Sequence, residues 1–448
     1  MNICLADGTI PEAAPARSKM ETILGLFTLL LGFFVIIAVG QRNREIASIL
    51  MLAFALRTGL TLVDSFVFTL PGAGDGIGWH VGATYMSKDG VVGTFQYLGG
   101  TGHVFYRYLM SFLYALFVPS ALMIKGLNVL FGTLLVKSTW ELSLLLGGDS
   151  KRARTVAWVM TLCPSLMFFS SVLLREVAVT YPLVLSIVFL IRWYQERRSI
   201  LIVQAVAALI ISMTFHSGGV AVLLFGGVWL VGNWFRSIIT GQFRNLGRNT
   251  LALAIGGVVV FAVLSSGFAL DKFNGIDSNN IDTLTGKQTN FAHGRAAYLE
   301  DLHAGSPVDL LWQAPIRIVY FLFAPFPWMI KDGADAFGLL DSMLFVVLTV
   351  YAVRNRRSLL LAPRIVLVLG VFAALALVFA LGVSNYGTAL RHRNKMLPLL
   401  VAAVISIPVE RRKEGRGRVP LRPPLMPRRS QPRSATTATL SSRRPPAA

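Results

Sequence analysis

The sequence predicts an all-α, polytopic membrane protein with about eleven membrane-spanning helices and several interfacial helices. Three observations predict this fold class. Of the 448 residues, 54% are hydrophobic and only 14% are charged. Apolar runs of the length that crosses a bilayer core recur along most of the chain. Lysines and arginines gather in short segments between these runs, as they do in cytoplasmic loops.

The first half of the chain alternates apolar runs with short polar turns. Because Arg42 and Arg44 follow the first run, we expect that turn in the cytoplasm and the loop 71–119 outside it. Within this loop, residues 104–118 are aromatic and too short for a span, which predicts an interfacial helix. The expected spans lie at about 22–39, 46–70, 120–146, 155–172 and 177–194.

The second half continues the alternation around a long polar segment. We expect an outer loop at 269–336, in which the apolar run 316–330 is an interfacial or re-entrant piece lodged against protein. A full span there would place the basic residues 354–357 on the outer side. The expected spans of this half lie at about 199–215, 218–235, 250–268, 337–353, 363–382 and 395–409.

Three regions follow from this topology: an extracytoplasmic segment 1–21, a membrane domain 22–409 and a tail 410–448. The tail is rich in Pro, Arg and Ser and lacks apolar periodicity, which predicts a disordered cytoplasmic segment. The net charge of +20 is accounted for by topology and by contact with anionic lipid head groups, so no nucleic-acid partner is predicted. We expect a multi-pass protein of the cell (inner) membrane, with membrane lipids around it.

Two charged pairs interrupt the apolar runs. Arg57 and Asp64 stand within the second expected span, where a pair that fixes helix packing is favoured over a substrate role. Arg175 and Glu176 stand side by side between two apolar runs, at the expected outer face. A charged pair so close to hydrocarbon is costly, and it is therefore a functional-site hypothesis.

The first candidate pair of carboxylates is Asp75 and Glu176, which are expected at the same outer membrane boundary. Two carboxylates at one depth can divide acid–base work or hold a metal, since burial and a like charge move their pKa values apart. The alternative is that each is structural, Asp75 as a helix N-cap and Glu176 as the partner of an arginine.

A cationic candidate site lies at the outer entry of the last expected span, in the sequence RHRNK. Arg391, His392 and Arg393 there break the positive-inside rule, and arginine offers paired donors to phosphate or pyrophosphate oxygens. The alternative is snorkelling of long side chains at the lipid interface.

All six histidines fall on or near the expected outer face, and His80 and His293 are candidate acceptor or donor contacts. Each of them taken alone is more often an ordinary loop residue. No clear metal-ligand spacing is present, so we assign no metal site and no certain cofactor, and we leave a divalent cation open.

Several of these motifs together resemble a family. Asp75 with WHVGATY, the aromatic helix after it, the span ALMIKGLNVLFGTLLVKSTWELSLLLGG and the segment PSLMFFSSVLLRE are similar to the amino-terminal half of GT-C membrane glycosyltransferases. The nearest resemblance is to the protein-mannosyltransferase-like glycosyltransferase family 39. It implies a GT-C-like fold and a hexosyltransferase-like enzyme of cell-surface glycan or polysaccharide synthesis. The implied donor is a polyprenyl-phosphate-linked sugar, used at the extracytoplasmic face on a glycan, lipid or protein acceptor.

The resemblance also implies roles for individual residues. Asp75 matches the first-loop catalytic carboxylate, which acts as base toward the acceptor, and Glu176 matches a second acidic residue that supports the site. The segment from Arg391 to Arg393 is similar to the outer-face motif that meets the donor phosphate, and Arg175 is placed with it. The chain departs from the family at Gly76, where a second acidic residue often follows the first.

Two other functions stay open at this point. The second half, with PFPWMI and RHRNKMLP, also resembles O-antigen-type polysaccharide polymerases that join undecaprenyl-pyrophosphate-linked repeat units. Arginines and a histidine would then handle the pyrophosphate. A transporter or flippase of lipid-linked sugars is the alternative from another class, although the chain lacks the repeated halves typical of transporters and offers mainly Arg57 as a midplane charge.

Overall fold

The computed structural model describes residues 19–70, 72, 74–98, 102–241, 243–265, 296–302 and 306–407. All of these belong to a unit that spans Met1–Pro408. The expected outer segment 1–21 lies mostly outside the described residues, as do much of the loop 269–336 and the whole tail 410–448.

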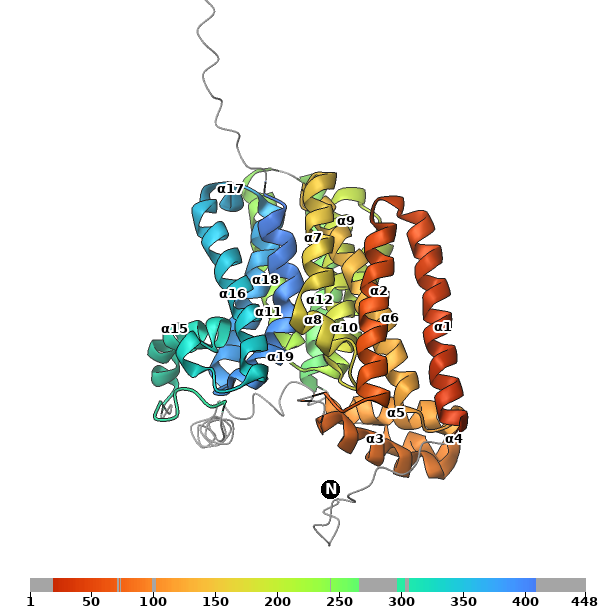
Figure 1. Ribbon diagram of the computed structural model, residues 1–448. Helices are drawn as coiled ribbons and strands as arrows, with labels where there is room; N and C mark the ends of the chain where they lie inside the picture. Colours follow the sequence, from red (N-terminus) through yellow and green to blue (C-terminus); the bar gives the residue numbers. More distant parts are fainter. Residues whose placement is uncertain are drawn as a thin grey trace, which may run out of the picture. The chain divides into compact units, whose positions relative to one another are not determined.

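The described chain is built from helices, without a β-strand, and one isolated bridge joins Ala297 to Asn385. Figure 1 shows their arrangement. The longer helices are α1 (Lys19–Arg42), α2 (Ala47–Phe66), α3 (Gly74–Met86), α5 (His103–Leu116), α6 (Ala121–Leu145), α7 (Ser150–Leu162), α9 (Glu176–Glu196), α10 (Ile200–Phe215), α11 (Gly219–Ile239), α12 (Phe243–Ser265), α15 (Pro307–Phe323), α16 (Gly333–Arg354), α18 (Pro363–Gly382) and α19 (Tyr386–Ile405). The shorter ones are η1 (Arg44–Ile46), η2 (Ser87–Asp89), α4 (Gly90–Gly93), η3 (Thr94–Tyr97), α8 (Pro164–Phe169), η4 (Pro327–Met329) and α17 (Arg356–Leu360).

Within the described residues, seven helices are long and apolar enough to cross a membrane. They are α1, α2 with its preceding turn, α6, α9, α11, α16 and α18. The chain is therefore a helical, membrane-embedded protein, as its sequence predicts. Four of the eleven expected spans are not among these seven, because they are broken, shorter or interrupted by charges: those at 155–172, 199–215, 250–268 and 395–409.

The expected span 155–172 is wrong as a continuous helix. Helix α7 ends at Leu162, Cys163 is extended with φ −61° and ψ 117°, and α8 restarts at Pro164. Proline disfavours the helical conformation in the residue before it, which explains the break at Cys163. After Phe169 the chain leaves helical structure until Glu176 begins α9.

The loop 71–119 contains more helix than its irregular composition predicts. The expected interfacial helix at 104–118 is confirmed as a helix and is α5. Helix α3 precedes it and packs against it, so that Ala83 lies in one buried cluster with Tyr106, Met110 and Tyr114 of α5. Both helices lie at one end of the helix bundle (Figure 1).

The expected re-entrant piece at 316–330 is the second half of α15 with the short turn η4. Arg317 of α15 is buried, and it donates to Gln313 at 3.0 Å and to Ser384 at 3.3 Å. The segment 296–302 binds next to it, because the backbone N–H of Tyr298 donates to Ser384 and that of Tyr386 to Ala296. These contacts fix the beginning of α19.

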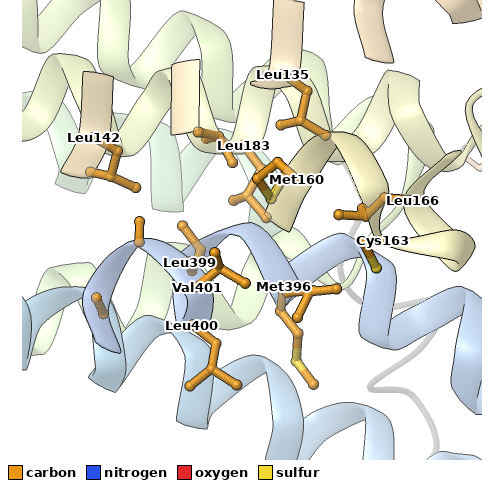
Figure 2. Close-up of a cluster of buried hydrophobic side chains, with 14 of the residues drawn as sticks. Leu135, Leu142, Met160, Cys163, Leu166, Leu183, Met396, Leu399, Leu400 and Val401 are labelled. Atoms are coloured by element: carbon orange, nitrogen blue, oxygen red, sulfur yellow. The ribbon is translucent and has the colours of Figure 1, made fainter. Parts of the chain in front are cut away.

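Helix α19 is the centre of the fold. Its residues from Arg393 to Val404 are all buried, and Met396, Leu399 and Val401 lie among side chains of α6, α7 and α9 (Figure 2). A helix that is buried on every side is a core helix rather than an amphipathic surface helix. The polar residues at its beginning must therefore find partners within the protein.

The basic segments between the spans meet at one end of the bundle. Ser150 at the start of α7 donates to Glu45 in the turn between α1 and α2 at 2.8 Å. Arg364 at the start of α18 and Gln195 at the end of α9 both donate to the carbonyl of Leu145, at 3.1 and 3.2 Å. Helices α3 and α5 lie at the opposite end (Figure 1).

Candidate functional site

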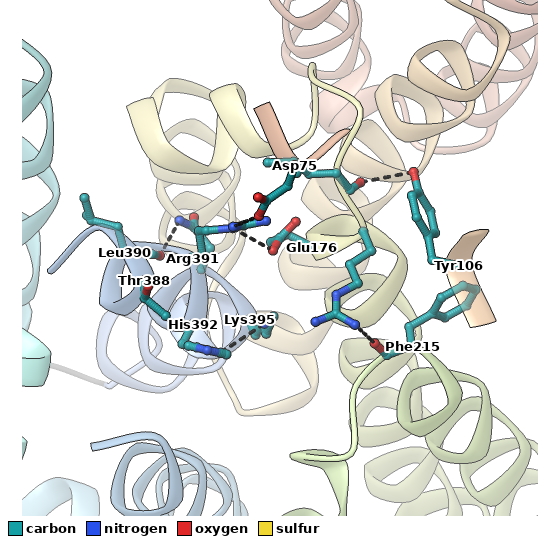
Figure 3. Close-up of polar contacts among 12 residues, drawn as sticks. Asp75, Tyr106, Glu176, Phe215, Thr388, Leu390, Arg391, His392 and Lys395 are labelled. Atoms are coloured by element: carbon teal, nitrogen blue, oxygen red, sulfur yellow. Dashed lines mark hydrogen bonds and ion pairs between the residues drawn. The ribbon is translucent and has the colours of Figure 1, made fainter. Parts of the chain in front are cut away.

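Three charged side chains from distant parts of the chain meet at the end of the bundle that carries α3. Arg391 Nη1 lies 2.6 Å from Asp75 Oδ2, and Arg391 Nε lies 3.1 Å from Glu176 Oε1 (Figure 3). Asp75 belongs to the first turn of α3, Glu176 begins α9 and Arg391 lies in α19. We call these three residues the Arg391 cluster. The sequence nominates Asp75 and Glu176 as a pair and Arg391 in a cationic segment, and the structure brings the three together.

Gly76 explains how Asp75 comes so close to the start of α9. A Cβ atom at Gly76 would lie 2.3 Å from the carbonyl oxygen of Leu173, which is shorter than any real contact. Only glycine therefore lets α3 approach the segment before Glu176. An acidic side chain at position 76 would push α3 away from this segment.

The segment 170–175, which leads into Glu176, is held by buried polar side chains of α2 and α6. Asn128 of α6 donates to the carbonyls of Val172 and Leu174, at 2.9 and 2.8 Å. Thr61 of α2 donates to the carbonyl of Ser171 at 2.7 Å. Irregular backbone at membrane depth is tolerated when protein groups satisfy its polar atoms, and that condition is met here.

Arg57 belongs to the same support. Its guanidinium donates to the Ser170 hydroxyl at 2.9 Å and to the carbonyl of Met160 at 3.1 Å. Asp64 binds Lys125 of α6 at 2.6 Å, so that Arg57 and Asp64 each contact a different part of the protein. Both residues do join helices, as the packing interpretation predicts, but with partners that their spacing could not reveal.

Arg175 stands beside the Arg391 cluster and turns toward α10. Its Nη1 donates to the carbonyl of Phe215 at 3.2 Å, and its guanidinium lies 5.9 Å from the ring centroid of Trp79. Burial lowers the pKa of Arg175, and the neighbouring charge of Glu176 opposes that shift. Gly102 makes room for it, because a Cβ there would lie 2.4 Å from Arg175 Nη1.

The two carboxylates differ in exposure. The side chain of Asp75 is 56% exposed, whereas that of Glu176 is 4% exposed. Glu176 Oε2 is buried and has no hydrogen-bond partner in the described protein. The cluster therefore holds one carboxylate in contact with solvent and one inside the protein.

His392 occupies a different side of the same helical turn. Its Nδ1 lies 3.0 Å from Lys395 Nζ (Figure 3). Its ring stacks on that of Phe379, with centroids 4.5 Å apart. The ring of His216, after α10, contacts that of His392 at 5.1 Å. Lys395 belongs to the predicted cationic segment RHRNK and shares the helix face of His392, three positions before it. His216 was not predicted as part of that segment.

The remaining predicted residues lie elsewhere. Arg393 does not join the Arg391 cluster: it is fully buried, donates to the carbonyl of Leu322 at 2.6 Å and lies 3.4 Å from Asp341 of α16. A phosphate contact for Arg393 is therefore not compatible with this arrangement. His80 contacts the Tyr114 hydroxyl at 2.8 Å, within the contact between α3 and α5. His293 lies outside the described residues.

In the described part of the chain, no three His, Cys, Asp or Glu side chains are grouped so that they could hold a metal ion. Asp75 and Glu176 come together around a guanidinium instead. Comparisons with protein-family models, with characterised proteins and with solved structures gave no match for this chain.

Proposed function

We propose that this protein is a membrane glycosyltransferase that moves a sugar from a polyprenyl-phosphate-linked donor to an acceptor at the extracytoplasmic face. The supporting observation is the Arg391 cluster, in which Asp75, Glu176 and Arg391 meet although 316 positions of sequence separate the first from the last. The resemblance to GT-C glycosyltransferases predicted these residues as one site, and a chance meeting of all three would be unusual.

The chemistry of such a transfer needs the two kinds of group that the cluster contains. A carboxylate can accept the proton of an acceptor hydroxyl, and a guanidinium can stabilise the charge on a departing phosphate. Arg391 uses Nε and Nη1 to hold the carboxylates, which leaves Nη2 outside both contacts. Arg175 and Lys395 provide further positive charge nearby, as an anionic donor requires.

The position of the site supports an extracytoplasmic active face. The Arg391 cluster includes the start of α3, at the end opposite to the basic segments (Figure 1). By the positive-inside rule, the basic end faces the cytoplasm.

Single cysteines in place of Asp89 and Glu196, in a Cys4→Ser background in which Cys163 is buried, test this orientation. A membrane-impermeant maleimide should label the first in intact cells and the second only after permeabilisation; the reverse pattern would contradict an outer active face.

The activity is tested with purified protein and a panel of undecaprenyl-phosphate-linked radioactive hexoses, by following transfer of label into membrane acceptors. We expect product from the wild type, a loss of about 100-fold or more in Glu176→Gln or Arg391→Ala, and a smaller loss in Asp75→Asn. Glu196→Gln is the matched control, because Glu196 is exposed at the far end of α9. Normal product from both amide variants would exclude a carboxylate mechanism.

A polymerase that uses undecaprenyl-pyrophosphate-linked units is the second candidate. The observation that favours it is the contact between Lys395 and His392 on the turn that carries Arg391, since this turn gathers cationic groups. Pyrophosphate-linked oligosaccharides in the same assay distinguish the two. Chain extension with the pyrophosphate donor, and none with the monophosphate donor, would favour the polymerase.

A further inference from the structure

The two carboxylates that hold Arg391 are not equivalent. Asp75 uses Oδ2 to bind Arg391 at 2.6 Å, and its side chain is 56% exposed to solvent. Glu176 binds Arg391 through Oε1 at 3.1 Å, while its Oε2 is buried without a partner in the described protein. The side chain of Asp75 is open to solvent, whereas Oε2 of Glu176 is buried.

Another buried carboxylate shows how the chain treats an acidic group with a structural role. Asp64 engages both oxygens: Oδ2 lies 2.6 Å from Lys125 Nζ, and Oδ1 accepts from the backbone N–H of Leu70 at 2.8 Å. A buried acceptor left without a donor costs about 1–3 kcal/mol, and more when it is charged. Asp341 Oδ2 and Glu141 Oε1 also lack a hydrogen bond, but each of them faces a guanidinium, that of Arg393 or that of Arg192. The unsatisfied oxygen of Glu176 is therefore able to accept a hydrogen bond from a ligand.

The surroundings of Glu176 fix the direction of this oxygen. Glu176 begins α9 and follows the segment 170–175, whose carbonyls are bound by Asn128 and Thr61. Its other oxygen is held by Arg391, which Asp75 holds in turn (Figure 3). The carboxylate is thus oriented on one side by an ion pair and presents Oε2 as its second acceptor.

We infer that Glu176, rather than Asp75, is the carboxylate that receives the proton of the acceptor hydroxyl, and that Asp75 is a positioning residue that holds Arg391. This assignment rests on the proposed glycosyl transfer and reverses the roles that the family resemblance implies. In the transfer step, the acceptor O–H bond breaks and its proton passes to Glu176 Oε2. The acceptor oxygen bonds to the anomeric carbon as the bond from that carbon to the phosphate oxygen breaks. The polyprenyl phosphate leaves with the electron pair.

The test compares steady-state kinetics of two amide variants on the undecaprenyl-phosphate-linked hexose that the wild type uses. Glu176→Gln should lower kcat by about 100-fold or more, with donor KM within about twofold of wild type, because a base acts in the chemical step. Asp75→Asn should mainly raise the donor KM, by about tenfold, because Arg391 loses its anchor and with it the donor phosphate. Glu196→Gln should resemble wild type in both constants.

A second measurement separates a proton acceptor from a side chain that only supports folding. Formate added to Glu176→Ala should restore part of kcat, since a small carboxylate can enter the space that the variant leaves, and it should not restore Asp75→Ala. Elution of both variants as folded monodisperse protein in detergent is the control for folding.

Two results would overturn the assignment. If Glu176→Gln keeps the wild-type kcat while Asp75→Asn loses it, Asp75 is the base and the proposed function stands. If wild-type protein forms no product from any labelled lipid-linked donor, the proposed function fails and the assignment fails with it.

Discussion

Arg391 and Arg393 lie two positions apart on α19, and they illustrate two uses of a charge in this protein. Arg391 binds two carboxylates of which one is open to solvent, at the end of the helix bundle. Arg393 is fully buried, and it contacts Asp341 at 3.4 Å together with a carbonyl and the Ser342 hydroxyl. Two positions on a helix are about 200° apart, so the two guanidinium groups leave α19 in nearly opposite directions.

The difference shows which charged pairs can take part in chemistry. The Arg393 pair is closed off by α8, α15 and α16, because Ser165 of α8 also binds Asp341 and Leu322 of α15 binds Arg393. No ligand could reach it without opening the bundle. The Arg391 cluster keeps a carboxylate that is 56% exposed, so a ligand can compete for its donors.

The largest effect on stability is expected from breaking the closed pair. Asp341→Asn removes the negative charge and leaves the Arg393 guanidinium buried without compensation, which costs about 3–5 kcal/mol of unfolding free energy. Asp75→Asn, which removes an exposed partner of Arg391, should cost less than about 1 kcal/mol. Thermal unfolding of both variants in detergent checks the contrast. Equal melting temperatures would show that the two pairs do not differ in this way.

A second substitution acts on the Arg391 cluster through packing alone. Gly76→Ala places a Cβ 2.3 Å from the Leu173 carbonyl and must move α3, and Asp75 with it, away from Glu176. We expect a cost of about 1–3 kcal/mol of unfolding free energy and loss of most of the proposed transferase activity. Gly78→Ala is the matched control, since nothing lies within 4 Å of a Cβ there. Full activity in Gly76→Ala would show that the site tolerates displacement of α3.

The sequence predicts the helical membrane class well, because hydropathy depends only on which residues are present. It misses the break of the expected span 155–172, because an average over apolar residues does not register one proline. Pro164 is nevertheless a local signal, and its effect on Cys163 could have been predicted. The partners of Arg57 could not, since they lie more than one hundred positions away in the chain.

The candidate site was predicted in part. Asp75, Glu176 and Arg391 each stand out as charges beside apolar sequence, and the structure joins them. Arg393 is also a charge beside apolar sequence, but it lies on the face of α19 opposite to Arg391. The spacing of two residues could have predicted this, because helical positions two apart point in nearly opposite directions. The asymmetry between Asp75 and Glu176 is different in kind. The asymmetry depends on how α3 packs against the segment 170–175, and no local sequence pattern predicts that packing.

The stability of the segment 170–175, which leads into Glu176, should depend on the side chains that donate to its carbonyls. Asn128→Leu removes one donor each from the carbonyls of Val172 and Leu174, which keep only the Leu174 N–H and the Tyr106 hydroxyl, and we expect a loss of about 1–3 kcal/mol. Asn233→Leu is the comparison, because the Asn233 side chain donates only within its own helix, to Trp229 at 2.9 Å. Thermal unfolding measures both. A larger loss in Asn233→Leu would mean that Asn128 does not hold the segment.

The smallest effect is expected at the basic end, where charges are exposed. Asp149 caps α7 by accepting from the backbone N–H of Arg152 at 2.8 Å, and its ion pair with the Arg152 side chain is a loose 3.8 Å. Asp149→Ala should cost about 0.5–2 kcal/mol through the lost cap, while Asp149→Ser, which can still cap, should cost almost nothing. Neither variant should change transferase activity, because this end lies opposite to the Arg391 cluster. If Asp149→Ser unfolds as easily as Asp149→Ala, the ion pair and not the cap stabilises the start of α7.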